Sequence, residues 1–181
     1  IPIIADEVMT GFYRTGTCFA TNQLNVMPDL MCISKAITGG TMAMGVTAVS
    51  SHITKEFESS DRGKMFFHGH SYSGNAIAMS AAVASLNLMQ TKEFQDDLAR
   101  VVASHEGFCK TLKEKTNFVN PRHLGLVLAF EVQSENQGYL SNMRDVLYQF
   151  FIKRNILLRP LGNTLYIIPP VCITNGQLES I

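Results

Sequence analysis

The sequence predicts an α/β protein, and three features of its 181 residues support that prediction. Short apolar runs rich in Ile, Leu and Val are typical of strands buried in a parallel or mixed sheet. Over residues 93–115, apolar side chains recur at the three-and-four spacing of a long amphipathic helix. The elements follow the order strand, strand, strand, helix, and then helix, strand, helix, strand, strand. We therefore expect two α/β parts, 1–90 and 91–181, with the helix 93–115 as the bridge.

Three strands are expected in the first part. Residues 1–5 form a continuous apolar run, which predicts a strand buried on both faces, and the run ends at Asp6. Residues 30–33 form a second buried strand, and Lys35 follows it closely. The run 45–50 is rich in Val and Thr and predicts a third strand.

Helices and further strands complete the prediction. Residues 76–89 are apolar on almost every side and rich in Ala and Ser, which predicts a buried helix that approaches its neighbour closely. The remaining expected elements are helices at 52–58 and about 139–154, and strands at 124–132, 156–158 and 165–168.

Composition excludes several classes of protein. Apolar residues make up 46% of the chain, charged residues 17%, and the formal net charge is zero, so neither a nucleic-acid nor a membrane surface is expected as a partner. No apolar run could span a bilayer, and no signal peptide is present. The four cysteines are scattered, which favours reduced, mostly buried thiols in a cytoplasmic protein. Because the chain opens without Met in a strand and closes as a helix starts, we expect a fragment.

The first candidate for chemistry is Lys35. A lysine at the mouth of a buried strand has a fixed stem, and partial desolvation there disfavours the ammonium form. The free amine is the nucleophile that a Schiff base requires. From this stretch alone, an ordinary solvated lysine is the alternative.

Pyridoxal 5'-phosphate is the cofactor that the surrounding residues suggest. It needs an amine, a carboxylate against its ring nitrogen, and hydroxyl or backbone N–H groups for its phosphate at a helix start. Lys35, Asp6 and the pair Ser71 and Ser73 are the candidates. The alternatives are an exposed acid at a strand end and serines that cap a helix, a role open to Asn75 as well.

Other kinds of site have weaker support. His68 and His70 lie two residues apart and could bind a metal with Asp6, but a third ligand at suitable spacing is missing, which favours hydrogen-bonded loop histidines. The glycine-rich nucleotide loops and the G-x-S-x-G motif of serine hydrolases are absent from the sequence.

Four blocks, in this order, resemble the class III aminotransferases of fold type I: IIADEVMTGFYRTG, SKAITGG, HGHSYSGNAIAMSAAVASL and LLRPLGNTLYIIPPVCIT. The resemblance runs over essentially the whole chain. It implies the C-terminal part of the large mixed-sheet, cofactor-binding domain, followed by the small α/β C-terminal domain. The family's glycine-serine phosphate loop and its ring-stacking aromatic belong to a part of the family sequence that precedes these blocks.

The resemblance implies roles for individual residues. Lys35 is similar to the Schiff-base lysine, which also moves the substrate proton, and Asp6 to the partner of the ring nitrogen. Ser71 matches a hydroxyl residue that holds the phosphate of the neighbouring subunit's cofactor; the biotin branch of the class often has Pro-Thr in place of His70-Ser71, and the hydroxyl is kept. Three residues are implied at the substrate pocket: Arg14 lines it, Arg159 takes the carboxylate of the keto substrate, and Tyr166 lies close to Arg159.

The fourth block is most similar to the branch of the class that acts in biotin synthesis. The implied reaction is transfer of an amino group to the keto acid 8-amino-7-oxononanoate, with S-adenosylmethionine as the expected donor, in a homodimer with shared active sites. The alternatives are an omega-amino acid or diamine transaminase, and a catalytically silent fragment. From its own stretch alone, Arg159 could also be a surface arginine beside a turn.

Overall fold

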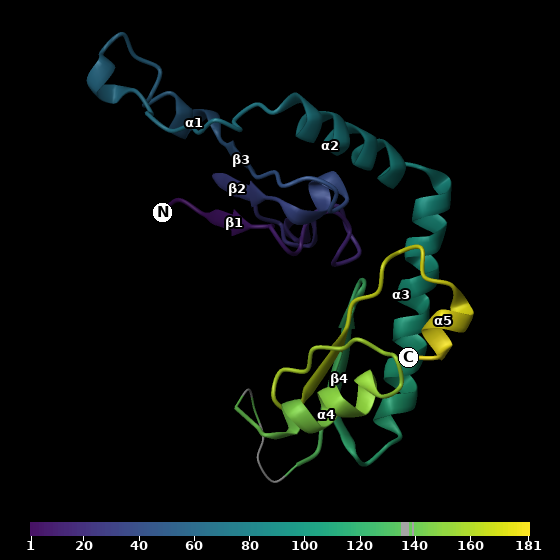
Figure 1. Ribbon diagram of the computed structural model, residues 1–181. Coiled ribbons are helices and arrows are strands. Elements are labelled where there is room, and N and C mark those ends of the chain that lie inside the picture. The colour runs from purple at the N-terminus through teal and green to yellow at the C-terminus, as the bar shows by residue number, and fades with distance from the viewer. Residues whose placement is uncertain (135–137, 139) are drawn as a thin grey trace. The chain divides into compact units, whose positions relative to one another are not determined.

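The computed structural model describes residues 1–134, 138 and 140–181 (Figure 1). The chain folds as two compact units, Ile1–Thr91 and Lys92–Ile181, each built around its own three-stranded sheet. The assignment of these units to a cofactor-binding domain and a small C-terminal domain stays a prediction.

The first unit contains a mixed sheet in the order β1-β2-β3. Strand β1 (Ile4–Asp6) pairs in parallel with β2 (Leu30–Ile33), which pairs antiparallel with β3 (Val46–Val49). This confirms the mixed sheet and the strands predicted at 30–33 and 45–50, whereas of the strand predicted at 1–5 only Ile4 and Ala5 lie in β1. The other elements of the unit are η1 (Ala20–Gln23), η2 (Lys35–Thr38), α1 (Ser51–Thr54), η3 (Arg62–Lys64) and α2 (Ala76–Met89).

The burial predicted for β1 and α2 is wrong for the described residues. Ile4 is 65% exposed and Ile77 is 69% exposed. Strand β1 lies at the edge of its sheet, and α2 packs against η2 along the side that carries Ala78 and Ala82. Apolar side chains of β1 and of the other sides of α2 consequently face outward.

The second unit packs helices on an antiparallel sheet in the order β4-β5-β6. Its elements are α3 (Lys92–Lys113), β4 (Phe118–Leu124), β5 (Val127–Val132), α4 (Met143–Ile152), β6 (Thr164–Ile167) and α5 (Asn175–Glu179). The buried core joins α3, β5, α4 and β6 through Cys109, Leu112, Leu128, Phe130, Leu147, Leu165 and Ile167.

Three element predictions for the second unit differ from the structure. The strand expected at 124–132 is the end of a hairpin, because the chain turns at Gly125, whose φ is +58°, between β4 and β5. Residues 156–158 form no strand. Helix α4 begins at Met143, while Tyr139, at the expected start, lies outside the described residues.

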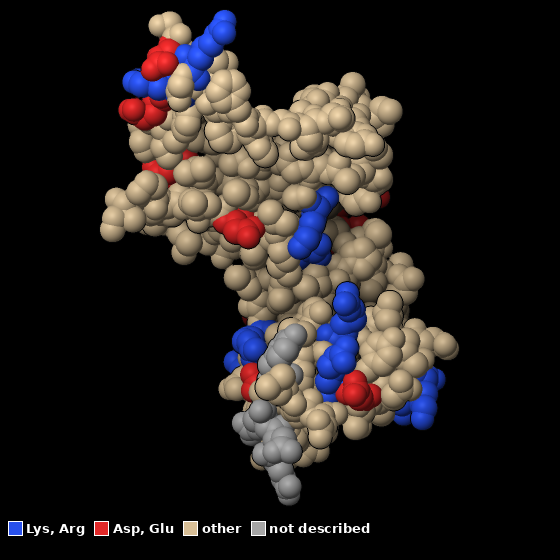
Figure 2. Space-filling model, turned by 60° about the vertical axis from the view of Figure 1, so that its left-hand side comes forward, with Lys and Arg blue, Asp and Glu red and all other residues tan. Residues whose placement is uncertain are grey.

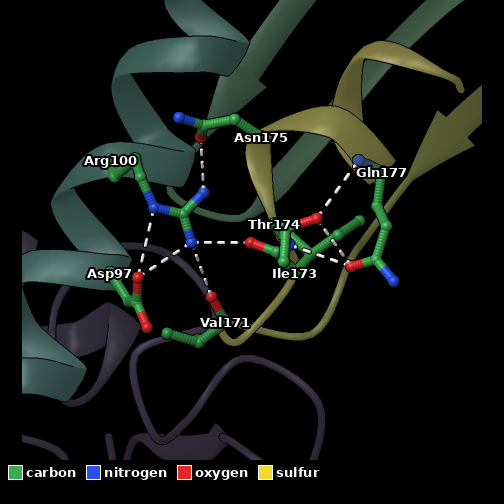
Figure 3. Close-up of polar contacts among 7 residues, drawn as sticks. All are labelled: Asp97, Arg100, Val171, Ile173, Thr174, Asn175 and Gln177. Carbon is green, nitrogen blue, oxygen red and sulfur yellow. Dashed lines mark hydrogen bonds and ion pairs between the residues drawn. The ribbon is translucent and has the colours of Figure 1, made fainter.

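Arg100 ties the C-terminal segment to α3 (Figure 3). Its guanidinium donates to the Asp97 carboxylate at 2.8 Å, to the carbonyl of Ile173 at 2.6 Å and to the side-chain oxygen of Asn175 at 2.9 Å. Thr174 caps α5, since its hydroxyl accepts from the N–H of Gln177. One side chain therefore fixes the start of α5 on the long helix.

Charged side chains on one face of the molecule are shown in Figure 2. On the face shown in Figure 2, acidic and basic side chains are interspersed with large uncharged areas. All four cysteines are free, but only Cys109 is buried, so the expectation of mostly buried thiols is wrong. Among the described residues, no helix has the length and apolar character needed to cross a membrane.

Candidate active site

The sheet of the first unit brings Asp6 and Lys35 to the same edge. Strands β1 and β2 run in parallel, and Asp6 lies opposite Cys32. Lys35 follows Cys32 by three residues. Asp6 and Lys35 therefore lie at the carboxyl ends of two neighbouring strands. Ligands of open α/β sheets bind at such ends.

Lys35 stands in an unusual backbone conformation. Its φ is +47°, a left-handed value that costs a non-glycine residue about 1–3 kcal/mol and persists only where the surroundings impose it. Next to it, the Ser34 hydroxyl donates to the carbonyl of Met44 at 2.6 Å. At the other end of η2, the buried Thr38 donates to the carbonyl of Met42, also at 2.6 Å. Strain held in this way marks a candidate functional position.

The predicted desolvation of Lys35 is not found. Its side chain is exposed, because β2 is only half-buried, and its amine makes no hydrogen bond or ion pair with a described residue. Asp6 is exposed as well, and its carboxylate accepts the N–H of Val8 at 3.0 Å. An amine and a carboxylate thus stand open to a ligand at one sheet edge.

The neighbouring carboxylate, Glu7, was not singled out from the sequence. It is 1% exposed and accepts hydrogen bonds from the Thr10 hydroxyl, from the N–H of Ala20 at 3.1 Å and from the N–H of Thr21 at 2.8 Å. Burial raises the pKa of Glu7, but the hydrogen bonds outweigh it and hold the pKa below its usual value. The sequence feature that could have pointed to Glu7 is its position directly before a loop with two glycines.

Arg14 lies in the loop 8–19, between β1 and η1. The N–H groups of Phe12 and Tyr13 both donate to the carbonyl of Cys18, which folds the loop back on itself. Phe12 is buried and packs edge to face on Phe19, with 5.5 Å between ring centroids. Arg14 is half-buried, and burial lowers its pKa. No described carboxylate pairs with it, so it suits an anionic ligand.

Ser71 lies in the turn before α2. Asn75 caps that helix, because its side-chain oxygen accepts the N–H of Ile77 at 3.0 Å. Ser73 instead accepts the N–H of His70 at 3.1 Å. Ser71 is exposed, and its hydroxyl has no hydrogen bond among the described residues. The capping role is therefore taken by Asn75, which leaves the Ser71 hydroxyl open.

A cleft of 1320 Å³ lies in the same unit. It is lined by apolar residues of 42–49 and by the turn 68–75, including His68 and His70, and it reaches Ser34. Asp6, Lys35, Arg14 and Ser71 are outside its lining. Within the described part of the chain, His, Cys, Asp and Glu form no group of three suited to a metal.

The second unit carries Arg159 and Tyr166. Tyr166 is half-buried on β6, opposite Ala129 of β5, whereas Arg159 is exposed and makes no hydrogen bond or ion pair with described residues. Between them the chain turns at Gly162, whose φ is +61°. Asn163, 1% exposed, anchors this turn by donating to the carbonyl of Val132 at 3.0 Å. Sequence reasoning did not single out Asn163.

The sequence is similar to that of a known enzyme family. The model of the family described as aminotransferase class-III matches residues 1–181. The adenosylmethionine-8-amino-7-oxononanoate aminotransferase of Synechococcus elongatus is 38% identical over 179 residues, which is 99% of this chain and 42% of that protein. The enzyme of the same name from Helicobacter pylori is 36% identical, again over 99% of this chain and 42% of that protein.

Solved structures agree on the fold. An omega-transaminase of Thermomicrobium roseum matches with a TM-score of 0.88 and 30% identity, covering 99% of this chain and 41% of that one. The adenosylmethionine-8-amino-7-oxononanoate aminotransferase of Methanocaldococcus jannaschii matches with a TM-score of 0.86 and 27% identity, covering 98% of this chain and 43% of that one. The chain thus has the fold of type I transaminases and spans about two fifths of these relatives. It belongs to the class III aminotransferases.

Proposed function

We propose that the protein carrying these residues is an aminotransferase of biotin synthesis, which transfers an amino group from S-adenosylmethionine to 8-amino-7-oxononanoate. The observation that carries this proposal is the placement of Asp6 and Lys35 at the carboxyl ends of neighbouring parallel strands. The named relatives at 38% and 36% identity support the choice of substrate.

Class III aminotransferases use pyridoxal 5'-phosphate. The residues at the sheet edge fit this cofactor, since an exposed amine and an exposed carboxylate stand where a ligand can reach both. When bound, the cofactor withdraws electrons from the substrate carbon. Lys35 would hold it covalently and move a proton between substrate carbons. Asp6 would keep the ring nitrogen protonated through its negative charge.

Ser71 is proposed to hold the cofactor's phosphate in a neighbouring subunit. Its hydroxyl is exposed and lies just before α2, where the helix start favours an anion. The outward apolar side chains of α2, among them Ile77 and Val83, support a homodimer, because a second subunit would cover them.

Arg159, Arg14 and Tyr166 are proposed to bind substrate. The guanidinium forks of both arginines suit a carboxylate, and neither has a carboxylate partner among the described residues. The keto acid has such a group far from its reacting carbon. We also infer a cytoplasmic location, because free cysteines are typical of reducing compartments.

An omega-transaminase is the second candidate, and the match to the Thermomicrobium roseum enzyme favours it. Complementation separates the two, since a biotin auxotroph lacking this step grows only if the protein makes the biotin precursor. Growth without biotin supports the first candidate. Absence of growth, together with omega-amine turnover by the purified protein, supports the second.

The test of the cofactor site is the substitution Lys35→Ala in the whole protein. Borohydride reduction of the wild type loaded with pyridoxal phosphate should label the peptide that contains Lys35, because reduction makes the carbon–nitrogen link permanent. Lys35→Ala should lose that label. Lys64→Ala, an exposed lysine of η3, is the matched control and should keep it. A label on any other lysine would show that Lys35 is not the attachment site.

A further inference from the structure

The buried carboxylate of Glu7 binds the two ends of the loop 8–19. The hydrogen bonds to its carboxylate come from residues of the segment between β1 and β2, among them the hydroxyl of Thr10 and the N–H groups of Ala20 and Thr21. Thr10 stands near the loop's beginning, whereas Ala20 and Thr21 stand just past its end. The carboxylate therefore joins the two ends of the loop 8–19.

The backbone of Glu7 fixes the same junction to the sheet. Its N–H donates to the carbonyl of Cys32 at 2.8 Å and extends the parallel ladder beyond Asp6. Its carbonyl accepts the N–H of Gly11 at 3.0 Å, and a Cβ at Gly11 would lie only 2.8 Å from that carbonyl oxygen. The loop is thus built closely around Glu7.

The backbone of the loop is strained, and the hydrogen bonds to Glu7 can maintain that strain. Phe12 and Tyr13 have φ values of +60° and +68°, in the left-handed region that non-glycine residues seldom adopt. Each such residue costs about 1–3 kcal/mol and needs surrounding bonds to persist. Arg14 follows directly, half-buried and without a carboxylate partner among the described residues.

We propose that Glu7 is a positioning residue for substrate: its carboxylate closes the loop 8–19 and thereby holds Arg14 in place at the substrate pocket, ready to bind the keto acid. This inference rests on the proposed function of Arg14. The charge matters as well as the shape, because two backbone N–H groups and a hydroxyl converge on a carboxylate that is 1% exposed.

The test is Glu7→Gln in the whole protein loaded with cofactor. The amide keeps the size of the side chain but turns an NH₂ group toward N–H donors, so the closure loosens. Trypsin should then cut after Arg14 about tenfold faster, which corresponds to about 1.4 kcal/mol. The KM for the keto acid should rise about tenfold and kcat should change by less than about threefold, as expected for lost uniform binding.

Two comparisons separate positioning from general damage. Glu131→Gln is the matched control: this carboxylate of β5 accepts from Arg122 at 3.1 Å in the second unit, and its loss should change neither readout. In an Arg14→Ala background, Glu7→Gln should raise KM no further, since the group that it positions is gone. Independent, additive effects of the two substitutions would overturn the proposal.

A second variant covers the case in which Glu7→Gln does not fold. Thr10→Val removes one hydrogen bond to Glu7 and should shift both readouts in the same direction by a smaller amount. Unchanged trypsin cleavage in Thr10→Val and Glu7→Gln would refute the closure. Cleavage after Arg14 reports on the loop alone. If the wild-type protein resists this cleavage but transfers no amino group, the proposed function is refuted and the loop closure is not.

Discussion

His105 contrasts with Glu7 among the buried polar side chains. It lies on α3, is 2% exposed, and neither ring nitrogen has a hydrogen-bond partner among the described residues. Burial lowers the pKa of His105; a polar contact with the backbone of Gly125 opposes this in part, and the charge of His123 adds to the lowering. The folded chain therefore disfavours the charged form of His105.

Acid should destabilise the second unit through His105. Because its folded pKa lies below the unfolded value of about 6.5, the unfolded state binds the proton first as pH falls. The free energy of unfolding should then decrease from about pH 6.5 downward, at up to about 1.4 kcal/mol per pH unit, until the pH passes the folded pKa. Urea unfolding between about pH 5 and pH 8 measures this slope.

The variant His105→Leu isolates the contribution of this residue. It removes the titrating ring from an apolar site, so its unfolding free energy should depend less on pH below about 6.5 than that of the wild type. Equal slopes for His105→Leu and the wild type would show that another group causes the acid sensitivity.

Single residues also show what the sequence could reveal of the candidate site. Asp6 and Lys35 were identifiable because each follows an apolar run and parallel strands end at a common edge. Glu7 and Asn163 were not, because their roles depend on partners distant in sequence, such as Thr21 and Val132. The left-handed backbone of Lys35 likewise depends on its surroundings, since its sequence contains no signal for it.

At the scale of elements, the junction of α3 and α5 depends on Arg100. Its side chain is 29% exposed, and its guanidinium donates hydrogen bonds to Asp97 of α3, to the carbonyl of Ile173 and to the side chain of Asn175 (Figure 3). Hydrogen bonds to a charged group contribute about 1.5–3 kcal/mol each when a partner is buried. A short helix of five residues gains little stability alone, so α5 depends on this junction.

Arg100→Met should release the C-terminal segment. The substitution keeps an apolar stem and removes the fork, so residues 171–179 should lose protection in hydrogen exchange, and the free energy of unfolding should fall by about 1.5–3 kcal/mol. Lys110→Met is the matched control on the same helix, since its ion pair with Glu106 is open to solvent and contributes little to stability. Unchanged exchange in Arg100→Met would show that α5 is held by other contacts.

Elements with a strong apolar periodicity were predictable from the sequence. Elements interrupted by turn-forming residues were not. The period of α3 and the apolar runs of β2 and β3 match the structure within a few residues. Strand β4 was missed, because Asn120 and Pro121 interrupt it; Asn120 has a φ of +52°, and the pairing shifts between Val119 and Arg122. Residues 156–158 are apolar but pair with no strand, and Leu157 is 71% exposed, so an apolar run alone does not show that a strand forms.

For the whole molecule, the apolar surface of α2 bears on assembly. Ile77, Met79, Val83 and Leu88 are between 48% and 69% exposed, although the sequence predicted a buried helix. The sequence of α2 is apolar on almost every side, but such a pattern does not specify whether the same chain or another chain buries these side chains. A second copy of the protein is the proposed cover, and it would bring Ser71 to the neighbouring active site.

Mixed subunits test this assembly. If Ser71 acts across the interface, a heterodimer of a Lys35→Ala subunit and a Ser71→Ala subunit has both lesions in one site and leaves the other site intact. Refolding the two inactive variants together should therefore restore transamination. Co-refolded Lys35→Ala subunits alone are the control. No recovery, despite heterodimers detected by mass, would show that Ser71 serves the site of its own subunit.

The closed loop between β1 and β2 has a consequence for how the family diversifies. Its two ends are joined by the carboxylate of Glu7, so a small change in the length of the loop would carry a small entropic cost and would not shift the register of β1 on β2. Under the proposed role of Arg14, mutations in the loop would alter which substrate is recognised and would spare the strand ends that carry Asp6 and Lys35. Natural selection could then change the substrate while the two residues proposed to hold the cofactor stay in place.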